Sequence, residues 1–202
     1  MQASTRRHAS PRPRAVLALL LLVPAPSIGV LAAMWAARGP VGQAVYGLSK
    51  LWILALPLLW LKLVERAPLS LSPPRRGGMA LGIASGCFMG GAIALAYLLL
   101  GSGWIDAAAV RRAAELNGIG TPGRYVGLAL YLTFINSLLE EYVWRWFVFR
   151  RAEELMPGPA AAPASGLFFT FHHTIALSLQ LAWPATLLSS AGIFAGATTW
   201  SW

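Results

Sequence analysis

The chain has 202 residues and a formal net charge of +9, yet 57% of its residues are hydrophobic and only 11% are charged. Its mean hydropathy is +0.61, far above that of an ordinary soluble domain, which excludes that class. The basic residues are spread through loops between apolar segments, so the charge does not indicate a nucleic-acid partner. Cys87 is the single cysteine, which excludes an intrachain disulfide framework and a multi-cysteine metal site.

Six apolar segments, each near the roughly 20 residues that a membrane-spanning helix needs, follow a basic tail over residues 1–14 that is expected to be disordered. The expected spans are residues 15–37, 44–64, 79–100, 124–149, 164–182 and 183–202. Basic residues precede the first segment, so its opening could also belong to a signal peptide. The apolar run continues to residue 37, which favours a retained, proline-kinked helix. The predicted fold is all-α, a multi-pass transmembrane helical bundle of about six spans.

Residues 101–123 are too polar to cross a membrane. Residues recur there at helical intervals, at Ile105, Ala109, Arg112 and Leu116, which predicts an amphipathic helix in the membrane interface. Residues 150–163 are interpreted as a charged loop before the fifth span.

Two polar or small-residue features lie inside the earlier spans. Lys50 in the second span is typical of a snorkelling or interhelical lysine rather than a catalyst. The third span is rich in small residues, and Gly86 and Gly90 have the spacing of closely packed membrane helices.

The loop charges favour a cytoplasmic N-terminus, because basic residues collect on the cytoplasmic side of membrane proteins. That topology places ten basic residues inside, namely Arg6, Arg7, Arg12, Arg14, Lys62, Arg66, Arg75, Arg76, Arg150 and Arg151. Four lie outside: Arg38, Arg111, Arg112 and Arg124. Basic residues are nearly all arginine, and Ala, Gly and Pro are abundant, which associates the chain with a GC-rich bacterium and its inner membrane.

The strongest functional signal is the group Glu140, Glu141 and Arg145 within an otherwise apolar stretch. A charged side chain at the bilayer centre costs about 2.5–3.5 kcal/mol on insertion scales, so such residues indicate a functional site. Glu141 and Arg145 are four residues apart and can form an ion pair. Glu140 points about 100° away round the helix and is left for chemistry. The alternative is that all three lie at the headgroup level and anchor a helix end.

His172 and His173 are the other strongly polar group within an apolar segment. A short connection makes their helix the antiparallel neighbour of the helix that carries Glu140. A carboxylate and an imidazole that face each other can orient a water molecule and remove its proton, which predicts a hydrolase. A divalent metal held by Glu140 and one histidine is the alternative, but adjacent histidines diverge and the i, i+4 pair of helical zinc sites is absent. No cofactor is therefore expected.

These residues carry a resemblance. The segment EEYVWR, from Glu140 to Arg145, matches the EExxxR motif of the CPBP intramembrane proteases, also called the CAAX protease or Abi family. Phe169 to His173 matches the FxxxH motif of the same family. The resemblance covers roughly residues 125–202 and implies a catalytic core over 124–202, preceded by transmembrane helices and an amphipathic loop over 15–123.

The resemblance implies that Glu140 and His173 activate the attacking water, and that Glu141 and Arg145 support the site. Phe168 with His172 fits FxxxH as well, but His173 is the preferred assignment. The family's later HxxxN or HxxxD motif, proposed to stabilise the oxyanion, does not follow His173. The chain ends in TTWSW within an apolar run, so we expect the core to be incomplete at its C-terminus and its activity to be reduced or lost.

The sequence thus predicts an intramembrane endopeptidase that hydrolyses peptide bonds near the membrane surface. Its expected partners are membrane lipid and a peptide or membrane-protein substrate. The alternative function is that of a non-catalytic membrane immunity or scaffold protein, in which the polar cluster serves helix packing. A small transporter is less favoured, because the chain shows no paired half-repeats.

Overall fold

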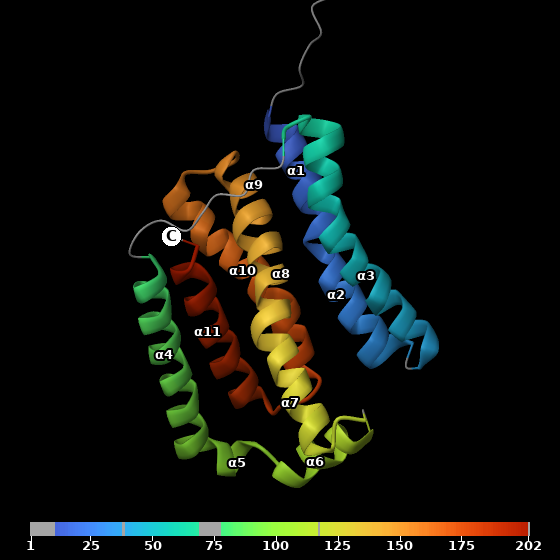
Figure 1. Cartoon of the computed structure of the whole chain (residues 1–202), viewed down its shortest axis with the longest axis vertical. Coiled ribbons are helices and arrows are strands. Elements are labelled where there is room, and N and C mark those ends of the chain that lie inside the picture. The colour runs from blue at the N-terminus through green and yellow to red at the C-terminus, as the bar shows by residue number, and fades with distance from the viewer. Residues whose placement is uncertain (1–10, 38, 69–77, 117, 202) are drawn as a thin grey trace, which may run out of the picture.

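The computed structural model describes residues 11–37, 39–68, 78–116 and 118–201, and all regular structure in them is helical (Figure 1). The predicted all-α fold is confirmed. The α-helices are α1 (Pro11–Leu22), α2 (Pro24–Leu31), α3 (Pro40–Leu59), α4 (Gly78–Ala96), α5 (Ser102–Trp104), α6 (Ala107–Leu116), α7 (Pro122–Leu130), α8 (Ser137–Glu140), α9 (Phe149–Glu153), α10 (Gly158–Ser178) and α11 (Trp183–Thr199). Wider π-helical turns continue them at η1 (Ala32–Ala36), η2 (Trp60–Glu65), η3 (Tyr97–Gly101), η4 (Tyr131–Asn136) and η5 (Glu141–Val148).

Joined end to end, these elements make long helical rods that match the six predicted spans. Three of the described rods are long and apolar enough to cross a membrane, at Arg12–Ala36, Pro40–Glu65 and Gly78–Gly101. The other three predicted spans coincide with the α7 to α9 rod, with α10 and with α11, and stay predictions as membrane crossings. The short helix α6 lies at one end of the bundle, at the position predicted for the interfacial helix (Figure 1).

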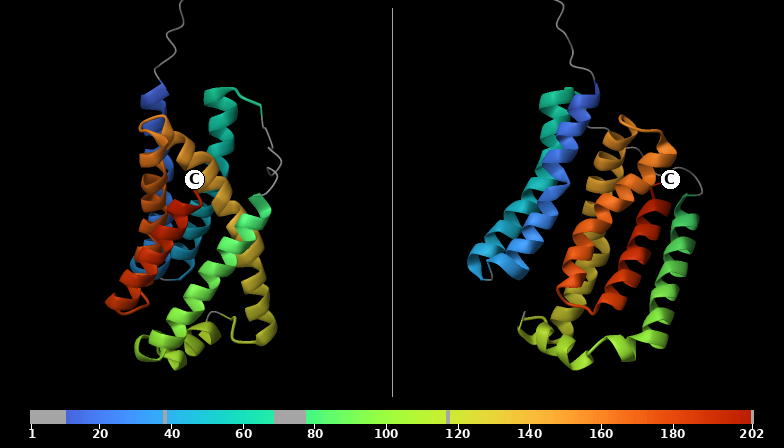
Figure 2. Two further views of the ribbon diagram at one scale, coloured as in Figure 1. Left: turned by 90° about the vertical axis from the view of Figure 1, so that its left-hand side faces the viewer. Right: turned by 180° about the vertical axis from the view of Figure 1, so that it is seen from behind.

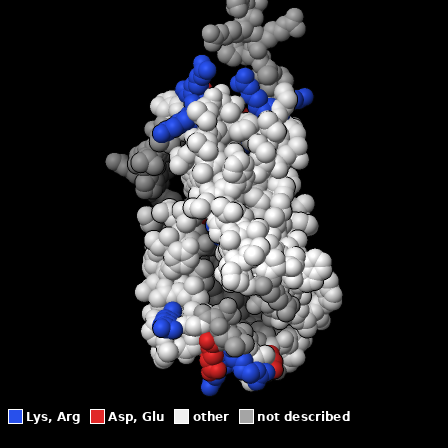
Figure 3. Space-filling view, turned by 90° about the vertical axis from the view of Figure 1, so that its right-hand side faces the viewer, with Lys and Arg blue, Asp and Glu red and all other residues white. Residues whose placement is uncertain are grey.

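On the face of the molecule that Figure 3 shows, most charged side chains lie at the two ends. On the face shown in Figure 3, lysines and arginines cluster at the top and bottom, and the broad band between them is almost free of charge. Large apolar side chains along the rods are exposed, among them Leu20, Leu51 and Phe88. A lipid environment covers such side chains at no cost, so the chain is a membrane protein.

The buried core joins α1, α3, η2 and η5, and it therefore contains the segment that follows Glu140. It contains Ala18, Leu19, Leu22, Ile53, Leu56, Trp60, Val143, Trp144, Phe147 and Val148. Because lipid tails are as apolar as leucine, this core is stabilised by close packing rather than by escape from water. Trp144, at 2% exposure, is the largest of its fully enclosed side chains in the described part of the chain.

The predicted close packing at Gly86 and Gly90 is wrong, because a Cβ atom on either glycine would meet nothing within 4 Å. Helix α4 has no buried residue. Close approach occurs elsewhere: Gly29 of α2 lies against the side chain of Ser49 on α3, and Gly166 of α10 lies against Thr198 on α11. Glycine spacing by itself does not say which face of a helix meets a neighbour.

The predicted loop over residues 150–163 is also wrong for most of its length. Helix α9 continues to Glu153 and α10 already begins at Gly158. Pro159 lies in the first turn of α10, where a proline costs no hydrogen bond, and Pro163 is accommodated inside the helix. Helix α1 begins at Pro11, inside the predicted disordered tail, and residues 1–10 lie outside the described part of the chain.

Helix α10 runs antiparallel to the rod that ends in α9 and contacts α2, η5, α9 and α11. From behind, it lies between α11 and the pair formed by α1–α2 and α3 (Figure 2). The Ser165 hydroxyl donates to the Trp144 carbonyl oxygen at 3.2 Å, which joins the two helices directly. The predicted antiparallel pairing of the glutamate and histidine helices is therefore confirmed, and it sets the site.

Candidate active site

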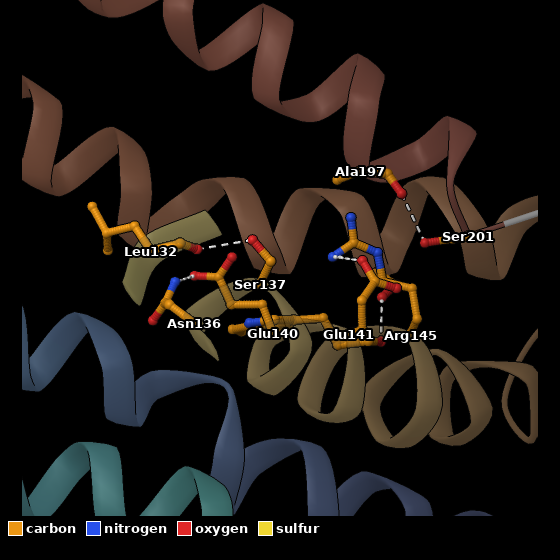
Figure 4. Close-up of polar contacts among 10 residues, drawn as sticks. Leu132, Asn136, Ser137, Glu140, Glu141, Arg145, Ala197 and Ser201 are labelled. Atoms are coloured by element: carbon orange, nitrogen blue, oxygen red, sulfur yellow. Dashed lines mark hydrogen bonds and ion pairs between the residues drawn. The ribbon is translucent and has the colours of Figure 1, made fainter. Parts of the chain in front are cut away.

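Glu140 is the last residue of α8 and is partly buried. The side-chain amide of Asn136, one turn earlier, donates to its Oε1 at 2.8 Å (Figure 4). This bond restricts the glutamate rotamer and offsets part of the cost of a carboxylate in apolar surroundings. Asn136 was missed by sequence reasoning, although its spacing of four residues before Glu140 was a usable signal.

Glu141 and Arg145 form the ion pair predicted from their spacing, with 3.4 Å between Oε1 and Nη1 (Figure 4). The Arg145 side chain is only 13% exposed, and its guanidinium carbon lies 5.1 Å from the centre of the Phe169 ring on α10. The contact between the guanidinium group and the ring joins η5 to α10. Their supporting role in catalysis stays a prediction.

The aromatic rings of α10 and η5 form one packed cluster. The His172 ring is stacked on Trp144 with centroids 5.3 Å apart and planes 12° apart, and Phe169 meets both rings edge-on. His173 lies beside His172, with centroids 4.1 Å apart, and its Nδ1 is 3.0 Å from the Phe169 carbonyl oxygen. Stacking on a fully buried tryptophan fixes the His172 ring plane.

A cavity of about 140 Å³ opens between α2, α3 and the rod that contains Glu140. Its lining residues are Pro26, Tyr46, Lys50, Ile53, Leu54, Tyr131, Asn136, Leu139, Glu140, Val143, Trp144 and His172. The volume is enough for several water molecules, whose share of the liquid is about 30 Å³ each. An acid, an imidazole, an amide and an ammonium group thus share one small space with mostly apolar walls.

Of the two histidines, His172 lies in the cavity wall with Glu140. The sequence favoured His173, which is not part of that wall. Glu141, Arg145 and Phe169 form the adjoining cluster rather than the cavity itself. Sequence reasoning also missed Lys50 as a site residue, because nothing in the sequence placed α3 opposite α8.

Lys50 takes part in no ion pair within the described part of the chain. Its ammonium nitrogen lies 5.6 Å from the centre of the Tyr46 ring, another wall residue. The cavity therefore contains one acidic and one basic side chain that form no ion pair with each other.

The cavity does not provide a full ligand set for a metal. Among the described residues no group of three or more His, Cys, Asp or Glu side chains could hold one. Glu140 and His172 are the only two such residues in the cavity wall, whereas catalytic zinc sites in proteins use three.

Fold and site define a membrane-embedded helical protein with a carboxylate and an imidazole at one internal cavity. Residues 122–202, from α7 to the end of α11, match the family model described as type II CAAX prenyl endopeptidase Rce1-like. The match supports the CAAX protease family that the resemblance predicted, and the matched segment contains Glu140 and both histidines. No curated protein and no solved structure gives a significant match to the chain.

Proposed function

We propose that the protein is an intramembrane endopeptidase of the CAAX protease type, in which Glu140 and His172 activate a water molecule in the cavity. The observation that carries the proposal is that both side chains line the same cavity. Both residues also belong to the segment that matches the family model. The endopeptidase class comes from the family, and the assignment of residues is our own.

In the proposed mechanism, Glu140 accepts a proton from the cavity water as the oxygen attacks the scissile carbonyl carbon. Asn136 keeps the carboxylate in position through its hydrogen bond. His172 then relays this proton from Glu140 to the leaving amine as the C–N bond breaks, so that the water oxygen stays on the acyl product and both side chains return to their starting states.

Lys50 supplies the positive charge for the oxyanion that forms when the carbonyl carbon is attacked. It lines the same cavity from the opposite helix and has no carboxylate bound to it in the described residues. Preorganised charges of this kind typically contribute about 10²–10³ in rate.

The proposed substrate is a peptide or membrane protein cut near the membrane surface, in a bacterial inner membrane with the N-terminus in the cytoplasm. The charge bias across the loops supports that orientation. The family points to C-terminal prenylated peptides as the first substrates to try.

The test is cleavage of a farnesylated CAAX-type peptide by protein reconstituted in lipid. Glu140→Gln and His172→Gln are each expected to lower kcat by about 10²–10⁴, the usual contribution of a general acid or base. Glu115→Gln is the matched control, because that glutamate is exposed on α6, far along the chain from the cavity. Full activity in the Glu140 variant, or loss in His173→Gln but not His172→Gln, would overturn the assignment.

A further inference from the structure

A second and larger hollow lies outside the cavity, at the end of the bundle where α1 begins and where η2 and α9 end. These three ends lie together at the top of the molecule in Figure 1. The hollow has a volume of about 730 Å³ and is lined by Arg14, Trp60, Glu65, Arg150, Arg151, Glu153 and Glu154. The proposed function uses none of them.

Arg151 joins two of the chain segments that line this hollow. Arg151 Nη1 lies 2.5 Å from Oε1 of Glu65 and 2.6 Å from Oε1 of Glu154, and its side chain is only 12% exposed. Because one guanidinium holds two carboxylates from different elements, η2 and the end of α9 are fixed to each other. The charges of Arg151, Glu65 and Glu154 are therefore already paired with one another.

Three other charged residues that line the hollow have no ion-pair partner in the described part of the chain. Arg14, Arg150 and Glu153 take part in no ion pair within the described residues. Trp60 lines the same hollow, is only 5% exposed, and its indole N–H has no hydrogen-bond acceptor in the described part of the chain. A buried donor without an acceptor is costly and calls for a partner from outside the chain. The hollow thus offers two free cations, one free anion and one buried donor.

We propose that this hollow binds the headgroup of a phospholipid that carries a phosphate and a primary ammonium group. The phosphate pairs with Arg14 and Arg150 and accepts the Trp60 N–H, since guanidinium groups and phosphate oxygens match in geometry. The ammonium group donates to Glu153. A mixed set of charges fits such a zwitterion better than a purely anionic headgroup, because Glu153 would repel the latter.

The position of the hollow identifies the ligand as a lipid rather than a soluble phosphate. The apolar rod Arg12–Ala36 begins there and the rod Pro40–Glu65 ends there, so the hollow stands at the level of lipid headgroups. Its volume lies within the roughly 300–1,000 Å³ range of small-molecule sites. Trp60 is also at the depth where tryptophan is enriched in membrane proteins.

The experiment measures lipid binding to the purified full chain in detergent by native mass spectrometry. The probes are phosphatidylethanolamine, phosphatidylcholine, phosphatidylglycerol and water-soluble phosphoethanolamine. We expect phosphatidylethanolamine to bind about tenfold more tightly than phosphatidylcholine, whose methylated nitrogen cannot donate a hydrogen bond to Glu153. Soluble phosphoethanolamine is expected not to displace the lipid.

The variants separate the two halves of the headgroup. Arg150→Gln is expected to weaken every phospholipid by about tenfold, and Glu153→Gln only phosphatidylethanolamine. Trp60→Phe keeps an aromatic ring but removes the donor and is expected to weaken all of them. Lys62→Gln is the control, because it removes one charge from the same η2 segment without lining the hollow.

Three results would overturn the proposal: equal binding of phosphatidylethanolamine and phosphatidylcholine, an equal loss in Lys62→Gln and Arg150→Gln, or displacement of lipid by soluble phosphoethanolamine. Arg150 and Glu153 are both exposed, so their variants should fold, and unchanged helical circular dichroism checks this. The measurement does not depend on peptidase activity.

Discussion

Replacing Gly166 by alanine should loosen the contact between α10, which carries His172, and α11. A Cβ atom at Gly166 would lie 2.6 Å from Thr198 Oγ1 and 3.2 Å from the Thr198 backbone nitrogen. The hydroxyl can rotate away, but the backbone nitrogen moves only if α11 moves with it. Overpacking of this kind typically costs about 1–3 kcal/mol, whereas alanine gains about 1 kcal/mol over glycine in a helix.

The net loss relative to the wild type is therefore about 0–2 kcal/mol. Relative to an alanine that meets no neighbour the loss is about 1–3 kcal/mol, which for a chain of this size corresponds to about 2–12 °C in Tm. The assay is thermal unfolding in detergent, followed by tryptophan fluorescence. Gly86→Ala is the matched control, because a Cβ atom there meets nothing within 4 Å and only the gain in helix propensity remains. The reasoning is refuted if Gly166→Ala is as stable as Gly86→Ala.

Three further predictions concern the cavity and the charged end of the bundle. Asn136→Ala should lower kcat about 10- to 100-fold, because Glu140 loses its hydrogen bond, and KM should change little; an equal rise in KM would point to substrate binding instead. Lys50→Met should lower kcat by about 10²–10³, with partial recovery in Lys50→Arg, and unchanged peptide hydrolysis would exclude the oxyanion role. Burial raises the pKa of Glu154 above its ordinary value of 4.5, against the opposing charge of Arg151. The folded state therefore favours the protonated acid, and the wild type should match Glu154→Gln in Tm below about pH 4.5 and fall behind it as pH rises through the raised pKa; a constant difference in Tm across that range would contradict this.

The sequence was a good guide to the helices because their length and composition leave few alternatives. Runs of about 20 apolar residues in a chain with 11% charge form membrane helices, since no other segment satisfies its backbone in lipid. The pairing of Glu141 with Arg145 was likewise set by local spacing. The charges of residues 150–163 were the weak point, because they suggested a loop where α9 and α10 cover most of the segment.

The sequence by itself determined that Glu140, Glu141, Arg145, Phe169 and the two histidines belong to neighbouring antiparallel helices, because a short connection between apolar segments allows little else. Only the tertiary structure decided which side chains share the cavity. Adjacent histidines point about 100° apart, so the choice of His172 depends on how α10 is rotated about its axis. That rotation is set by contacts from distant parts of the chain, such as the stacking of Trp144 on the His172 ring and the approach of Gly166 to Thr198. The placement of Lys50 opposite Glu140 has the same origin, since packing between helices carries no signal in the spacing of either segment.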